Sequence, residues 1–229
     1  MTVKEKIQRA AAAAVLSRMI KYVRKDPDTN LVKLIDKSEL FVGNIFPSKN
    51  FDSFREGAKD PENVWRQLAL RLIDEIDDNV LMNMMLALGL GAGVNGTKIV
   101  RANREKYHCN IPWVILLDPT SACNRKCKGC WSAEYGHKQS LTFDELNDIV
   151  NQGVAMGTHF YMFTGGEPLL RKKDLIKLCE LHPDCAFLSY TNADLVDEEF
   201  CEEMKRVGNI ALAISIEGSK ESNDARRGE

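Results

Sequence analysis

The chain has 229 residues, of which 44% are hydrophobic and 28% charged, the balance of a soluble globular protein with one or two domains. The net charge of −2 gives no basic field for nucleic acid, so we expect no nucleic-acid partner. Seven cysteines without a secretory signal indicate metal ligands and reduced thiols in a cytoplasmic protein, not a disulfide framework.

Residues 1–107 have the apolar spacing of helices. An apolar stripe from Val3 to Tyr22 predicts a first helix, which the polar stretch around Pro27 ends. A second helical region covers residues 62–90, with apolar side chains expected on one side at Trp65, Leu68, Leu72, Ile73 and Ile76. We therefore expect a helical N-terminal region over residues 1–107.

Two features of this region have alternative interpretations. The first 25 residues carry seven Lys or Arg and one acid, Glu5, so this helix could make peripheral contact with an anionic membrane or pack its stripe on the rest of the protein. The apolar stretch 81–94 has the length of a buried helix, not of a membrane span.

The glycines at positions 91, 93 and 96 fit the spacing of a dinucleotide-binding loop. Such a loop follows a strand and opens a helix, whereas these glycines follow a helix-like segment. We expect a helix end and a flexible linker instead.

From residue 112 onwards, short apolar runs alternate with helical patterns. The predicted strands are residues 113–117, 159–163, 185–190 and 210–216. The first predicted helix begins at Thr142, which forms a capping box with Glu145. Two further helices are predicted over residues 172–181 and 198–207. This alternation predicts about four βα units with a parallel sheet over residues 108–229. In such folds functional residues collect at the carboxyl ends of the strands.

Three cysteines, Cys123, Cys127 and Cys130, follow the first of these strands. Thiolates ligate iron–sulfur clusters, and three of them on a four-iron cubane leave one iron open to bind a ligand. The main alternative is structural zinc with Cys109 or His137 as fourth ligand. A redox pair at Cys127 and Cys130 would leave Cys123 without a role.

These cysteines, the run TGGEPL (164–169), and the segments SIEG (215–218) and DARRG (224–228) together resemble the radical S-adenosylmethionine superfamily. The similarity is to the branch of molybdenum-cofactor-synthesis enzymes and peptide-modifying maturases. One departure is Gly129, where the family commonly has an aromatic residue; Trp131 follows the last cysteine instead.

The resemblance implies an α/β fold, a partial (β/α) barrel, preceded here by the helical region. The family's core has six βα units, and this sequence has four, so we expect a truncated product or fragment. A compact variant whose N-terminal helices cover the open sheet edge is the alternative.

The resemblance also implies the chemistry. A [4Fe–4S] cluster on Cys123, Cys127 and Cys130 would cleave S-adenosylmethionine to a 5′-deoxyadenosyl radical that takes hydrogen from the substrate. Cofactor contacts are implied for the glycine loop, for residues at later strand ends and for an arginine facing the cofactor carboxylate: Gly165, Gly166, Glu167, Pro168, Asn192, Ser215, Glu217 and Arg227. For Asn192, Ser215, Glu217 and Arg227, a satisfied polar group at a strand end is the alternative.

The implied partners are a one-electron donor of the flavodoxin or ferredoxin type and an unidentified substrate, a peptide, cofactor precursor or lipid. The alternative function is a non-catalytic iron–sulfur or zinc-binding module, or an inactive fragment of such an enzyme. The remaining cysteines, at 109, 179, 185 and 201, are expected to be buried thiols. No role is expected for the histidines at 108, 137, 159 and 182.

Overall fold

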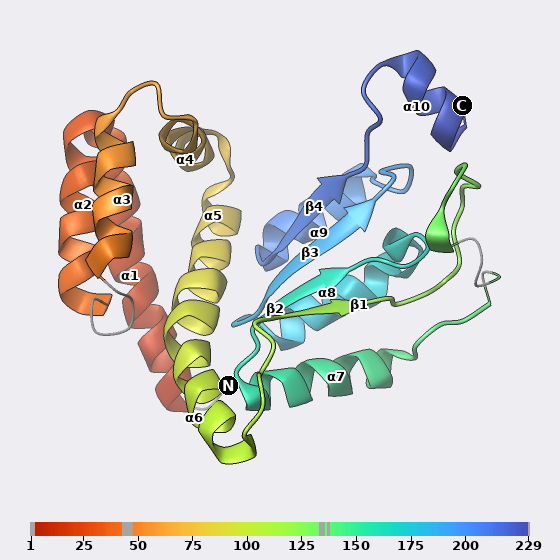
Figure 1. Cartoon of the computed structure of the whole chain (residues 1–229), viewed down its shortest axis with the longest axis horizontal. Coiled ribbons are helices and arrows are strands. Elements are labelled where there is room, and N and C mark those ends of the chain that lie inside the picture. The colour runs from red at the N-terminus through yellow and green to blue at the C-terminus, as the bar shows by residue number, and fades with distance from the viewer. Residues whose placement is uncertain (1–2, 43–47, 133–135, 137, 229) are drawn as a thin grey trace. The chain divides into compact units, whose positions relative to one another are not determined.

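The computed structural model describes residues 3–42, 48–132, 136 and 138–228 (Figure 1). The chain divides into two compact units, Met1–Leu86 and Ala87–Glu229. His137, one candidate ligand in the zinc alternative, lies outside the described residues.

The first unit is helical, as the sequence predicts. Its helices are α1 (Val3–Lys25), α2 (Pro27–Val42), α3 (Ser48–Lys59), α4 (Val64–Glu75) and α5 (Asp78–Met85). Pro27 occupies the first position of α2, where a missing N–H costs nothing, so it both ends α1 and starts the next helix.

Polar side chains join these helices to one another. The guanidinium of Arg55 on α3 donates to Asp36 on α2 at 2.6 Å and also to Glu39. Arg24 on α1 donates twice to the carbonyl of Ile73, at 2.9 and 2.6 Å, near the end of α4. A cation at the carboxyl end of a helix also complements its dipole.

The apolar stripes of this unit are only partly buried. On α1, Ile20 and Val23 are buried, whereas Val3, Ile7 and Val15 are exposed. The expected apolar side of α4 lies largely exposed, with Trp65 72% accessible. Periodicity identified these helices correctly but did not reveal which apolar residues would be covered.

Residues 78–107 form one continuous helical run, made of α5, the π-helix η1 (Leu86–Gly96) and α6 (Thr97–Tyr107). By length and composition alone the run Asp78–Tyr107 could cross a membrane, and 33% of its most apolar window is buried. A core helix of a soluble protein meets the same test.

The glycines at 91, 93 and 96 lie inside this run, so the expected linker was wrong. No strand precedes them among the described residues, which removes the dinucleotide-binding interpretation. A Cβ on Gly91 would lie 2.2 Å from the carbonyl oxygen of Asp184, and one on Gly96 2.5 Å from that of Gly157. These glycines, which belong to the second unit, let η1 lie close to the backbone at Asp184 and Gly157 of the same unit.

The second unit is built on a parallel sheet in the order β1-β2-β3-β4. Its strands are β1 (Val114–Leu117), β2 (Phe160–Phe163), β3 (Ala186–Thr191) and β4 (Ile210–Ile214). Its other helices are α7 (Phe143–Met156), the 3₁₀ turn η3 (Pro168–Arg171), α8 (Lys172–Leu181), α9 (Glu198–Val207) and α10 (Lys220–Arg227). The predicted α/β class with successive parallel βα units is confirmed.

Local signals fix the start of α7. The Thr142 side chain accepts from the N–H of Glu145 at 3.2 Å, and the Glu145 carboxylate accepts from the N–H of Thr142 at 2.7 Å. This is the predicted capping box, which satisfies donors that a helix start leaves open. Gly157, at φ +100°, ends the helix in the left-handed conformation.

Alternation along the strands divides the sheet into two faces. One face is buried under α7, α8 and α9 through Leu117, Tyr161, Phe163, Phe187 and Ile210. On the other face Leu116 and Tyr190 are exposed. The loops that carry the predicted motifs follow the carboxyl ends of the strands, at one end of the sheet (Figure 1).

Candidate functional site

The three cysteines open onto one cavity of about 260 Å³ at the carboxyl ends of the strands. The predicted site residues that line it come from four separate loops and from the end of α10: Cys123, Cys127, Cys130, Gly165, Gly166, Glu167, Pro168, Asn192, Ser215 and Arg227. Glu217 does not line the cavity but pairs with Arg227, which does. The fold therefore brings together residues that lie up to about a hundred positions apart.

None of the three cysteines forms a disulfide, and all three are half-buried. Burial raises the pKa of the Cys123 thiol, although the backbone N–H of Arg125 donates to its sulfur at 3.4 Å and lowers it. Iron binds the thiolate, so loading this site releases protons. Among the described residues no three Cys, His, Asp or Glu side chains converge on one point as ligands of a single ion do. A cubane takes one thiolate on each of three irons, which is the donor set that these three cysteines offer.

The loop after β2 is bound tightly to the segment that leads into the cysteines. Gly166 donates its N–H to the carbonyl of Thr120 at 2.9 Å, and Glu167 donates to that of Ala122 at 2.8 Å. A Cβ on Gly166 would lie 2.1 Å from the oxygen of Ala122, and Gly165 has a φ of +102°. Glycine is thus required here for close packing of two loops, a reason that sequence reasoning did not identify.

Glu167 is a buried carboxylate, 1% exposed. Its Oε1 accepts from the N–H of Leu169 at 3.0 Å and the hydroxyl of Thr191 at 2.8 Å. Its Oε2 accepts from the N–H of Asn192 at 2.9 Å. A carboxylate offers roughly four acceptor positions, so three donors of the protein leave room for one more, such as an ammonium group in the cavity.

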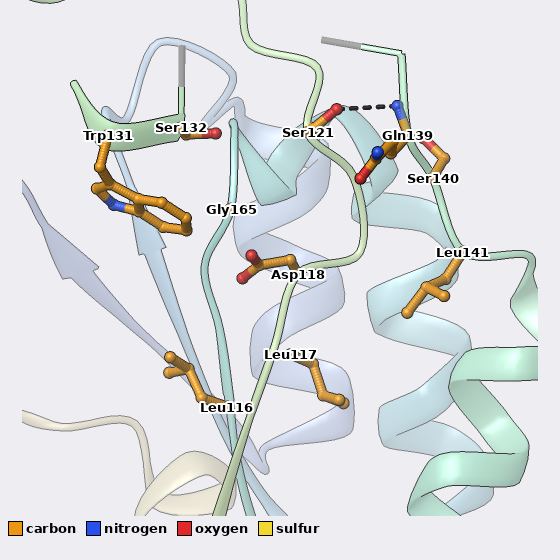
Figure 2. Close-up of a pocket in the computed structure, with 10 residues that line it drawn as sticks. All are labelled: Leu116, Leu117, Asp118, Ser121, Trp131, Ser132, Gln139, Ser140, Leu141 and Gly165. Carbon is orange, nitrogen blue, oxygen red and sulfur yellow. Dashed lines mark hydrogen bonds between the residues drawn. The ribbon is translucent and has the colours of Figure 1, made fainter. Parts of the chain in front are cut away.

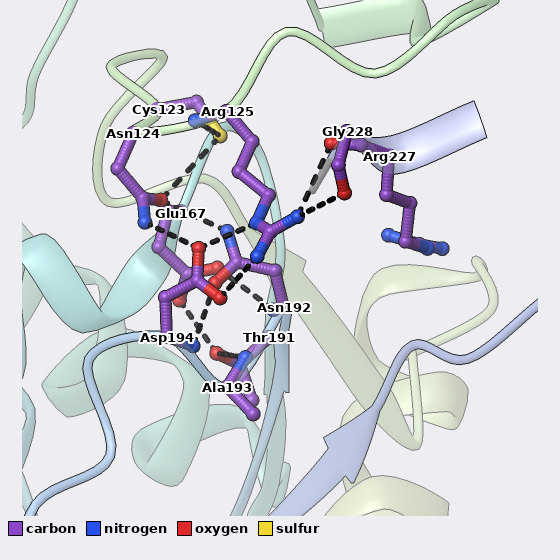
Figure 3. Close-up of polar contacts among 10 residues, drawn as sticks. All are labelled: Cys123, Asn124, Arg125, Glu167, Thr191, Asn192, Ala193, Asp194, Arg227 and Gly228. Atoms are coloured by element: carbon purple, nitrogen blue, oxygen red, sulfur yellow. Dashed lines mark hydrogen bonds and ion pairs between the residues drawn. The ribbon is translucent and has the colours of Figure 1, made fainter. Parts of the chain in front are cut away.

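Arg125, which lies between the first two cysteines, is a site residue that the sequence did not reveal. Its guanidinium forms a two-pronged pair with Asp194, with Nε–Oδ2 at 2.5 Å and a second contact at 2.7 Å (Figure 3). It also donates to the carbonyls of Arg227 at 3.2 Å and Gly228 at 2.9 Å, at the end of α10. This pairing lowers the pKa of Asp194.

Asparagine side chains extend the same network (Figure 3). Asn192 donates to the Asn124 side chain at 2.8 Å, and Asn124 donates to Asp194 at 3.0 Å. The backbone N–H of Lys128 donates to the carbonyl of Arg226 at 2.8 Å. The cysteine loop is therefore held from two sides, by the loop after β3 and by α10.

Arg227 supplies a buried donor at the cavity. One of its terminal nitrogens pairs with Glu217 at 2.5 Å, and this contact, with that of Arg226, lowers the pKa of Glu217. Its Nε is buried and meets no acceptor among the described residues. A buried unpaired donor is costly, so an anionic group such as a carboxylate would fit here. The backbone of Ser215 donates to Thr191 at 2.9 Å, and its side chain lines the cavity.

The other cysteines and the described histidines lie away from this cavity. Cys179 and Cys185 are buried, as predicted, and burial raises the pKa of both thiols. Cys109 is exposed and Cys201 half-buried, so for these two the expected burial was wrong.

Comparison with known proteins gives the family. The family model described as the Radical SAM superfamily matches residues 117–228, which contain every element of the cavity. This match identifies residues 117–228 as a radical SAM domain. Radical SAM proteins use a [4Fe–4S] cluster and S-adenosylmethionine, and the three cysteines and the unpaired Arg227 donor fit this pair.

Among curated radical SAM relatives, the chain is 29% identical to the Fe-coproporphyrin III synthase of Methanosarcina barkeri, over 50% of this chain and 30% of that protein. It is 32% identical to the GTP 3′,8-cyclase of Alkaliphilus oremlandii, over 45% of this chain and 34% of that protein. The chain spans about a third of the length of these relatives.

A solved structure, SuiB of Streptococcus suis bound to precursor peptide SuiA, is similar with 22% identity and a TM-score of 0.48. The match covers 58% of this chain and 31% of that chain.

Proposed function

We propose that this chain binds a [4Fe–4S] cluster through Cys123, Cys127 and Cys130 and cleaves S-adenosylmethionine reductively to act on a hydrogen-donating substrate. The observation that carries the proposal is one cavity lined by the three thiols, the glycine loop and Arg227. When bound, the reduced cluster supplies one electron to the sulfonium group. The protein's own part is to hold, orient and shield the reactants.

Each group of residues has a separate task in this proposal. The three cysteines would hold the cluster, with the amine and carboxylate of S-adenosylmethionine beside it in the cavity. Glu167 accepts from the amine with its remaining acceptor position, and Arg227 faces the carboxylate. Gly165, Gly166 and Pro168 shape the loop. Asn192 and Ser215 line the cavity and would contact the ribose or methionine part of S-adenosylmethionine. Glu217 would act on the same part through its pair with Arg227.

The electron donor in this proposal is of the flavodoxin or ferredoxin type. The substrate in this proposal is a peptide, a cofactor precursor or a lipid. We place the protein in the cytoplasm, a reducing compartment in which cysteines stay available as iron ligands.

The test is formation of 5′-deoxyadenosine from S-adenosylmethionine by anaerobically reconstituted, chemically reduced protein, measured by liquid chromatography and mass spectrometry. We expect product from the parent chain and from Cys109→Ala, which changes an exposed cysteine outside the cavity. We expect none from Cys127→Ala. A cluster-containing chain that forms no product would contradict the proposal and favour a non-catalytic iron–sulfur module.

A further inference from the structure

A second cavity of about 520 Å³ lies beside the cysteine cavity, at the free edge of β1 (Figure 2). The two cavities share Trp131 and Gly165. A molecule in the second cavity would therefore lie next to the proposed cofactor.

Apolar side chains form one part of its wall. Leu116 is 60% exposed and Trp131 53% exposed, and both face the cavity together with Leu141. Large apolar side chains that open onto a cavity favour an apolar body in the ligand. Small polar side chains, Ser121, Ser132, Gln139 and Ser140, line the rest.

One carboxylate, Asp118, lies in this cavity. Figure 2 shows it extending to the same side of the β1 segment as Leu116 and the Trp131 indole. A Cβ on Gly165 would lie 3.0 Å from the Cβ and 3.2 Å from the Cγ of Asp118, so the glycine leaves space around this carboxylate.

The Asp118 carboxylate has no hydrogen-bond donor or cation paired with it in the described part of the chain. Partial burial raises its pKa, and no nearby positive charge offsets the effect. By contrast, Glu167, which lines the neighbouring cavity, and Asp194, on the loop after β3, are both paired with donors of the protein. The Asp118 side chain is nevertheless exposed at the cavity wall, so a cation that arrives with a ligand can pair with it without displacing a partner of the protein.

We propose that this cavity is the substrate pocket and that it selects a ligand with an apolar body and a cationic nitrogen group, an ammonium or guanidinium, which binds Asp118. The body of the ligand would pack on Leu116 and Trp131. The pocket's description as a substrate site rests on the proposed function, whereas its preference for a cation does not.

The test uses three small probes of matched shape: 4-fluorobenzylamine, 4-fluorobenzyl alcohol and 4-fluorobenzoate. Their binding to the full, anaerobically reconstituted chain is measured from the fluorine NMR line width of each probe. We expect the amine to bind about tenfold more tightly than the alcohol, the increment of one charge-assisted hydrogen bond, and the benzoate to bind most weakly.

Three variants locate the binding site. Asp118→Asn keeps the shape but removes the charge, so the amine should lose its roughly tenfold advantage. Asp144→Asn removes an exposed carboxylate outside the cavity and should leave the advantage unchanged. Trp131→Ala should weaken all three probes. Near-ultraviolet circular dichroism and thermal unfolding confirm that each variant is folded.

Equal binding of the three probes, or an amine preference that persists in Asp118→Asn, would overturn the inference. Because probe binding requires no cleavage of S-adenosylmethionine, its failure is distinguishable from failure of the proposed function, which is measured by 5′-deoxyadenosine.

Discussion

Arg125 places a positive charge and a rigid fork between two of the cysteines. It contacts Asp194 on the loop after β3 and two carbonyls at the end of α10. Because a planar guanidinium can hold a carboxylate through two parallel bonds, it fixes orientation as well as distance. We interpret Arg125 as a residue that positions the cysteine loop.

We therefore predict that Arg125→Ala weakens iron retention. The variant removes contacts worth about 1–2 kcal/mol in total, so iron should be lost several-fold faster to a chelator. Arg125→Lys should recover only part of the retention, since an ammonium cannot form the fork. The measurement is the rate of iron release from reconstituted protein, followed by absorbance.

The matched control is Arg206→Ala, which removes an exposed ion pair with Glu203 on α9, away from the cysteines. Iron release from this variant should equal that of the parent. A double-mutant cycle of Arg125 with Asp194 should give a coupling of about 1 kcal/mol in unfolding free energy. If the two substitutions were additive, the positioning role would be wrong.

At the scale of elements, close backbone packing explains the glycines in η1. Alanine is a better helix former than glycine by about 0.5–1 kcal/mol. At Gly89, where an added Cβ meets nothing within 4 Å, the substitution should stabilise the protein by that amount. At Gly91 the new methyl group would meet the Asp184 oxygen at 2.2 Å, so steric strain should outweigh the helix gain.

The prediction is that Gly89→Ala raises and Gly91→Ala lowers the free energy of unfolding, the latter by about 1–3 kcal/mol. Chemical unfolding followed by circular dichroism gives both values. The two residues share one helix and one substitution, so any general effect of alanine cancels. Equal stabilisation by both changes would show that η1 does not pack on the Asp184 loop.

The helices also show which elements local sequence patterns could predict and which they could not. The boundaries of α8 and α9 were predicted correctly, since apolar spacing and polar ends are both local signals. Helix α10 was not predicted, because it is polar throughout and has no buried residue to create a periodic pattern. The helical state of residues 91–96 was missed because the glycines at 91, 93 and 96 lower the local helix propensity, whereas close packing, a tertiary effect, favours glycine at 91 and 96.

The distinction between local sequence signals and tertiary contacts applies to the candidate site as well. Spacing along the chain indicated the cysteines, and the strand ends indicated the glycine loop, Asn192 and Ser215. The Arg125–Asp194 pair joins residues 69 positions apart in two loops, and no local pattern records such a contact. The second cavity around Asp118 likewise depends on Trp131 and Gly165 meeting at the edge of β1.

For the molecule as a whole, the described sheet contains four parallel strands with one face covered by helices. The family match covers residues 117–228, and the chain spans about a third of its curated relatives. Activity and substrate therefore stay proposals, whereas the cluster site can be tested on this chain directly, because all three proposed ligands belong to it.

The most direct measurement of the central claim is the metal content and electron paramagnetic resonance of the anaerobically reconstituted chain. We predict about four irons per chain and a reduced-cluster signal that S-adenosylmethionine alters by binding to the open iron. Alanine at Cys123, Cys127 or Cys130 should remove most of the iron, and Cys109→Ala should remove none. One equivalent of zinc without iron, or a cluster that persists when all three cysteines are alanine, would contradict the account.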